Sequence, residues 1–162
     1  MYKRQDQDYF VDGVTDELIG HLAQVSGLRR VISRTSVVRY KHTDKSLPVI
    51  ARELNVDAVV EGTVYQVGEN VRIRVQVIDP LPEERSLWSK TYERAGNQVL
   101  ILYGEMARAI AETTKVDLTA DETRRLADAR QVDPEAYDAY LKGEFHWHKF
   151  TKQDLETSRQ YY

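Results

Sequence analysis

Strict alternation of apolar and polar residues from 70 to 77 is the feature that most constrains the fold. Its apolar members are Val71, Ile73, Val75 and Val77. Successive side chains of a strand point to opposite faces of a sheet, so this pattern predicts a strand with one buried and one wet face. The turn Gly68-Glu69-Asn70 precedes it, and residues 57–67 before the turn are rich in β-branched side chains.

A further strand is expected at residues 87–92, after the break Asp79-Pro80-Leu81-Pro82. Together these segments predict an antiparallel meander. A short β run is also expected at residues 28–34, centred on Val31 and Ile32.

Helical spacing of apolar residues marks the segments around the meander. Asp12 is the expected N-cap of a first helix that ends before Gly27, with Asp16 and Glu17 near the positive end of its dipole. A second helix is expected at 47–54 and a long one at 99–116, lying on the sheet.

Thr119 and Glu122 have capping-box spacing, which predicts a polar helix at 120–130. The fold class is therefore α/β, of the α+β type. We expect a small mixed sheet of about four strands with helices mainly on one face, followed by an α-helical hairpin.

The hairpin is indicated by an aromatic-rich helical pattern at 136–147 and by a cap formed by Thr151 and Asp154. Two helices of this size cannot bury their own apolar face, so the pattern predicts the start of a repeat array that continues beyond Tyr162. Its aromatic residues form either the core of that repeat or an exposed interaction surface: Tyr137, Tyr140, Phe145, Trp147 and Tyr161.

The composition of the chain excludes or disfavours several classes of function. The chain has 162 residues, a net charge of −3 and no cysteine, which excludes disulfides and thiolate chemistry and disfavours nucleic-acid binding. Its apolar runs are far shorter than the roughly 20 residues that cross a bilayer, so no membrane contact is expected from this segment. Cytoplasmic and periplasmic placements both stay open.

A basic cluster occupies residues 29–45. It predicts either a small-anion or phosphate site or a solvated charged edge. The candidate anion-binding residues are Arg29, Arg30, Arg34, Thr35, Ser36, Arg39 and Lys41.

Catalysis is not expected, because no serine lies in a nucleophile elbow and no glycine loop has phosphate-binding spacing. His146 and His148 flank Trp147, but residues two apart on a helix diverge by about 200° and cannot chelate one ion together. No catalytic, cofactor-binding or metal-ligating residue is therefore assigned.

Four stretches in register resemble the TolB amino-terminal-like domain, which bacteria place ahead of tetratricopeptide repeats. They begin at Asp8-Tyr9-Phe10, Val31-Ile32-Ser33, Ile50-Ala51-Arg52 and Leu87-Trp88-Ser89, and the resemblance covers residues 8–118. It divides the chain into an α/β domain at 1–118, a bridging helix and linker at 119–133, and an incomplete repeat at 134–162.

The resemblance implies a non-catalytic interaction or signal-relay module of a larger bacterial regulator. Such a regulator is linked to an adenylate cyclase, a kinase or a transcription-regulator domain, and the implied partners are proteins, further repeats and an output domain in cis. The family has an apolar strand before the Asp-Tyr-Phe segment, whereas residues 1–7 here are polar, so the first strand is expected to be missing.

Overall fold

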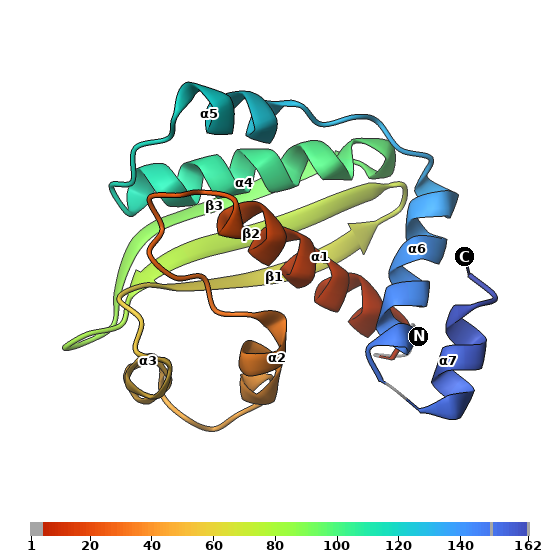
Figure 1. Cartoon of the computed structure of the whole chain (residues 1–162), viewed down its shortest axis with the longest axis horizontal. Helices are drawn as coiled ribbons and strands as arrows, with labels where there is room; N and C mark the ends of the chain where they lie inside the picture. Colours follow the sequence, from red (N-terminus) through yellow and green to blue (C-terminus); the bar gives the residue numbers. More distant parts are fainter. Residues whose placement is uncertain (1–4, 150, 162) are drawn as a thin grey trace.

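The computed structural model describes residues 5–149 and 151–161 and has an α+β architecture. Its sheet consists of β1 (Val59–Val67), β2 (Asn70–Asp79) and β3 (Arg85–Ala95), in the order β1-β2-β3 with antiparallel pairing throughout (Figure 1). The meander and the fold class are confirmed. Over the described residues, however, the sheet has three antiparallel strands, where about four in a mixed sheet were expected.

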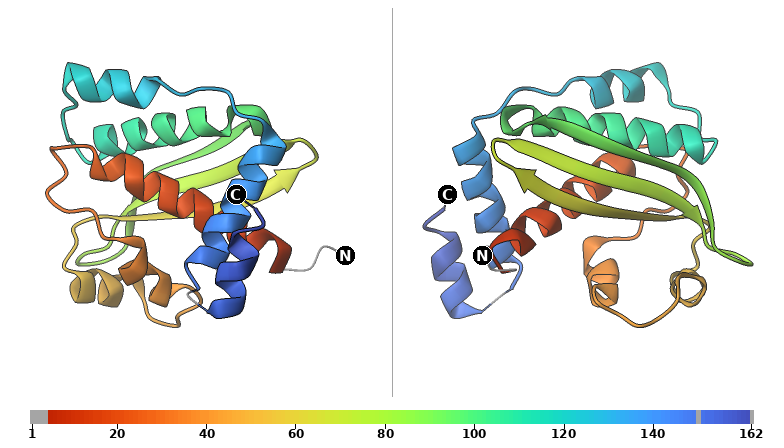
Figure 2. Two further views of the ribbon diagram at one scale, coloured as in Figure 1. Left: turned by 45° about the vertical axis from the view of Figure 1, so that its right-hand side comes forward. Right: turned by 180° about the vertical axis from the view of Figure 1, so that it is seen from behind.

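The central strand β2 has the alternation that its sequence predicts. Val71, Ile73, Val75 and Val77 are at most 4% exposed, whereas Arg72 and Arg74 face solvent. The long helices α1 (Gln5–Ala23) and α4 (Val99–Thr113) cover the buried face. The view from behind shows that the opposite face of the sheet carries neither of them (Figure 2).

Helix α4 contributes fully buried residues to the core. Leu102, Tyr103 and Met106 are fully buried and pack with Phe10 and Val14 of α1 and with the apolar face of β2. A short 3-10 turn, η2 (Gly96–Gln98), leads into α4 from β3. None of the helices in the described ranges is long and apolar enough to cross a membrane.

Helix α1 begins earlier than expected. Because α1 starts at Gln5, Asp12 lies inside the helix and is not its N-cap, and Asp16 and Glu17 lie beyond its first turn. Gly13, which follows the expected N-cap, also lies inside the helix, and its lack of a side chain leaves room for Leu141. A Cβ there would lie 2.4 Å from Cδ2 of Leu141. The expected loss of a first strand concerns residues 1–7, of which 1–4 lie outside the described residues and the rest open α1.

Residues 24–54 connect α1 to β1. The strand predicted at 28–34 is wrong, because this segment is a loop that runs into α2 (Arg34–Val37). Val31 contacts the core without a partner strand beside it. The 3-10 turn η1 (Val38–Tyr40) and helix α3 (Leu47–Leu54) follow, and α3 has the predicted bounds.

Both carboxyl-terminal helices begin at capping residues, of which only the cap of the second helix was predicted. Asp133 caps α6 (Pro134–Trp147), and the Thr151 hydroxyl accepts the Asp154 N–H at 3.0 Å at the start of α7 (Lys152–Ser158). The Ser158 hydroxyl donates to the Gly143 carbonyl at 2.8 Å and joins the two helices. Helix α6 lies against α1, as the views in Figures 1 and 2 agree.

Helix α5 (Ala120–Ala127) has the predicted capping box and packs closely on α4. Gly104 allows this approach, because a Cβ at that position would lie 1.9 Å from the carbonyl oxygen of Leu126.

We therefore expect Gly104→Ala to lower the free energy of unfolding by about 2 kcal/mol or more. The new Cβ would clash with the backbone of α5, which cannot move aside as a flexible side chain can. Gly20→Ala is the matched control. It lies in α1 with nothing within 4 Å of the new Cβ, so it should be neutral or stabilising by up to about 1 kcal/mol. Urea unfolding of both variants measures the difference, and equal effects would contradict the packing argument.

Glu122 holds both the start of α5 and the loop that follows α1. Its carboxylate accepts the Ser26 N–H at 2.7 Å and the Thr119 N–H at 2.8 Å, while the side chain is buried. These backbone N–H groups, Ser26 first, lower the pKa of Glu122 to about 2.

A lowered pKa in the folded state means that the unfolded chain binds the proton more tightly. The stabilisation by Glu122 is therefore complete above the unfolded pKa of about 4.3 and is lost as the pH falls toward 2. We expect Glu122→Gln to flatten the fall in stability between pH 4.5 and 2, as measured by urea unfolding across that range. An unchanged slope would show that the carboxylate is not held by these bonds.

Candidate functional site

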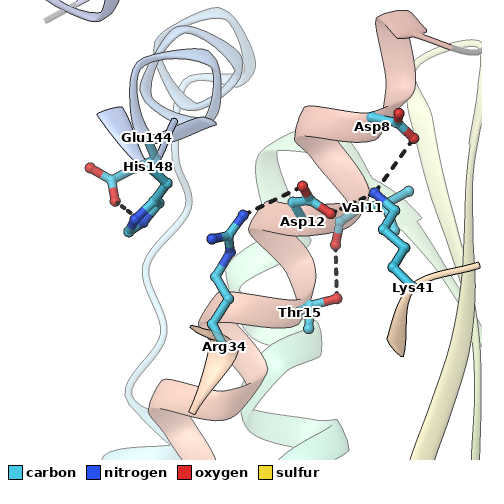
Figure 3. A network of polar contacts seen from close by, with 8 residues as sticks. All are labelled: Asp8, Val11, Asp12, Thr15, Arg34, Lys41, Glu144 and His148. Atoms are coloured by element: carbon cyan, nitrogen blue, oxygen red, sulfur yellow. Dashed lines mark hydrogen bonds and ion pairs between the residues drawn. The ribbon is translucent and has the colours of Figure 1, made fainter. Parts of the chain in front are cut away.

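Part of the predicted basic cluster meets the acidic side of α1. Lys41 Nζ lies 2.8 Å from Asp12 Oδ1 and 3.6 Å from Asp8 Oδ1, and Arg34 lies 3.4 Å from Asp12 Oδ2. Figure 3 shows both cations converging on Asp12, Arg34 from the start of α2 and Lys41 from the end of η1. Two of the candidate anion-binding residues therefore already have carboxylate partners.

Burial gives this contact more weight than an ordinary surface ion pair. The side chains of Asp12 and Arg34 are 16% and 19% exposed, whereas the pair Asp121 and Arg124 on α5 is more than 75% exposed. Reduced exposure strengthens the attraction between the charges. Asp12 thus holds α2 and the turn after it on α1.

The other predicted cations belong to different contacts. Arg30 donates to the carbonyl oxygens of Leu54 and Asn55 (2.8 Å for Asn55), at the end of α3. The Arg39 guanidinium lies 5.2 Å from the centroid of the Tyr40 ring. Arg29 and Thr35 are exposed, and Ser36 is half-buried. The structure thus distributes the cluster over several separate contacts.

Lys41 also borders a hollow of about 600 Å³ on the outer face of the sheet. Its lining includes the charged side chains of Glu61 and Arg74, so its walls carry both signs.

The aromatic residues predicted as one surface are divided by the fold. Tyr137 is 8% exposed and its hydroxyl lies 2.7 Å from that of Tyr103, so it is part of the core and not of a surface. Burial raises the pKa of both phenols well above the ordinary range. Tyr140, Trp147 and Tyr161 are 39%, 48% and 38% exposed, and Phe145 is half-buried.

The structure brings together a third group of polar side chains that the sequence did not predict as a group. Asp16 of α1, Glu144 of α6 and His148 at the end of α6 each offer one ligand atom, and these atoms lie within 4.8 Å of one another. The spacing of four between Glu144 and His148 is a local signal that places both on one helix face. Nothing local connects either of them to Asp16.

His146 and His148 point to different acids, which agrees with their spacing of two. His146 Nδ1 lies 2.8 Å from Asp154 Oδ1, and His148 Nε2 lies 3.5 Å from Glu144 Oε2 (Figure 3 draws the second pair). The Thr151 hydroxyl, followed by His146, lowers the pKa of Asp154.

Comparison with known proteins identifies a relative among bacterial proteins. The chain is 37% identical over 137 residues to "Putative adenylate cyclase 3" of Rhizobium meliloti (strain 1021). The match takes in 85% of this chain but only 23% of that protein, so the chain corresponds to less than a quarter of its relative's length. No protein-family model matches the chain, and no solved structure matches it significantly. The resemblance to TolB-like domains and to tetratricopeptide repeats therefore stays a prediction.

The contact between Asp12 and Arg34 can be measured by a double-mutant cycle with Asp12→Ala and Arg34→Ala. Because both side chains are mostly buried, we expect a coupling energy of about 1 kcal/mol. The same cycle on Asp121 and Arg124 should give about 0.3 kcal/mol or less. Equal couplings in the two cycles would remove the structural role given to Asp12.

Proposed function

We propose that this chain is a non-catalytic interaction and signal-relay module of a larger bacterial signalling protein linked to an adenylate cyclase. The observation that carries the proposal is the match to a protein named as an adenylate cyclase, of which the chain covers 23% at 37% identity. In this proposal, cyclic nucleotide synthesis belongs to the remaining part of such a protein. The module then acts on that part through contacts.

The roles of the polar side chains support a structural function for this module. Glu122, which is the most buried carboxylate among the residues whose burial is described, caps α5 and holds the loop around Ser26. Asp12 is occupied by Arg34 and Lys41, and the buried phenols of Tyr103 and Tyr137 bond to each other. Each of these groups bonds to a partner within the chain and so stabilises the fold.

The α6–α7 hairpin is the proposed point of attachment for further tetratricopeptide repeats in cis. Tyr140, Trp147 and Tyr161 expose more than a third of their surface there. Aromatic surface of this kind is buried when a neighbouring repeat stacks on it. The same surface is the proposed site for protein partners, and Tyr137 no longer belongs to it.

The contacts do not favour the alternative of anion sensing. A phosphate that binds Arg34 and Lys41 has to compete with the carboxylates of Asp8 and Asp12 at distances of 2.8 to 3.6 Å. Arg30 is engaged with backbone carbonyls. We therefore retain interaction and relay as the proposed function.

The test uses the native full-length protein that carries this chain. The chain alone should make no cyclic AMP from ATP, whereas the full-length protein should. Tyr140→Ser combined with Trp147→Ser should change the regulated rate of the full-length protein by about fivefold or more, the lower range of allosteric coupling.

Tyr65→Ser combined with Leu87→Ser is the matched control, because both residues are exposed large apolar side chains on the sheet. This control should leave the rate unchanged. Synthesis of cyclic AMP by the chain alone, or a full-length protein without a cyclase domain, would overturn the proposal.

A further inference from the structure

The end of α6 brings an imidazole and a carboxylate against a carboxylate of α1. Glu144 and His148 lie four residues apart, with Glu144 Oε2 3.5 Å from His148 Nε2. Figure 3 shows the Glu144 carboxylate beside the imidazole ring. Asp16 completes a group whose ligand atoms all lie within 4.8 Å of one another, and all three side chains are half-buried. The group spans the contact between α1 and α6.

These separations suit a bound metal ion. Tetrahedral zinc with ligand distances of about 2.0 to 2.1 Å places neighbouring ligand atoms about 3.3 Å apart. The pair Glu144 and His148 is already close to that spacing, and no separation within the group exceeds 4.8 Å. One imidazole with two carboxylates is a ligand set for zinc and other first-row transition metals, while all-oxygen sets suit calcium and magnesium.

His148 Nε2 is a buried nitrogen without a hydrogen bond. It has almost no solvent-accessible surface and no hydrogen-bond partner among the described residues. Its contact with Glu144 meets the distance criterion of an ion pair only. A buried ring nitrogen in this situation has a desolvation cost that a metal bond would remove.

The acidic residues of α1 concentrate negative charge where α1 meets α6, and a cation there would neutralise it. Asp8, Asp12 and Asp16 follow one another at a spacing of four, at which like charges on a helix repel. Among the ion pairs of the described residues, Lys41 and Arg34 serve the first two acids, and none includes Asp16.

We propose that Asp16, Glu144 and His148 bind a divalent first-row transition-metal ion that joins α6 to α1. The three protein ligands leave at least one coordination position for water. The ion neutralises the convergent carboxylates and fixes the hairpin on the α/β core. This inference does not depend on the proposed relay function, since it concerns binding and stability only.

The experiment titrates the purified chain, stripped of metal with EDTA and dialysed, with ZnCl2 in a calorimeter. We expect one zinc ion per chain. Asp16→Asn, Glu144→Gln and His148→Gln should each weaken binding by at least about tenfold, the smallest loss usual for zinc-site mutations. Zinc at about 100 times its Kd should raise the Tm of the wild type by about 5 to 10 °C.

His146→Gln is the matched control, because His146 lies two residues away and pairs with Asp154 at 2.8 Å. It should retain wild-type zinc affinity. Cobalt(II) gives a second readout, since its visible absorption bands should arise in the wild type and in His146→Gln but not in His148→Gln.

Folding of the variants is checked without metal. Asp16→Asn removes a carboxylate whose ligand atom lies within 4.8 Å of that of Glu144, so its Tm in EDTA should equal or exceed that of the wild type. A cooperative melting transition in EDTA shows that Glu144→Gln, which also loses the ion pair with His148, is folded. Wild-type affinity in all three ligand variants, or an equal loss in His146→Gln, would overturn the metal site. The same result would leave His148 and Glu144 as an ion pair only.

Discussion

The packing of α1 between the sheet and α6 is the constraint on which the other features depend. Phe10 and Val14 bury one side of α1 in the core above β2. Gly13 lies beside them and leaves the space that Leu141 of α6 fills. A helix buried on two sides needs a small residue where the second helix crosses, and glycine there costs helix stability of about 1 kcal/mol. The close packing of Leu141 offsets that cost.

The polar side of α1 then organises the rest of the chain. Asp12 holds α2 and Lys41 against the helix, and Asp16, one turn further along, faces α6. The same row of acids on α1 therefore takes part in two contacts, one with the α2 segment and one with α6. The first is neutralised by cations of the protein itself, whereas the second concentrates negative charge around His148. The difference between the two contacts follows from which segment lies opposite each turn of α1.

The sequence predicts those parts of the fold that depend on neighbours along the chain. The alternation of β2, the bounds of α3 and the capping box of Thr119 and Glu122 are local patterns, and each is confirmed. The start of α1 and the loop at 28–34 depend on tertiary contacts. Gly13 resembles a helix boundary until Leu141 is known to lie against it. At the candidate metal site only the pair Glu144 and His148 has a local signal, because Asp16 reaches it across the helix crossing.

The same crossing determines how a relay through this chain would operate. Tyr137 and Leu141 of α6 belong to the core that includes α4 and β2, so α6 cannot turn freely on a linker at residues 131–133. A displacement of the hairpin either carries α1 with it or separates Leu141 from Gly13 and exposes apolar surface. The first path transmits motion to the sheet through a rigid contact, and the second requires local unfolding. A metal ion bound by Asp16, Glu144 and His148 would oppose only the second path, because it bridges the two helices that have to separate. Metal occupancy would thus favour rigid transmission from the α6–α7 hairpin to the sheet.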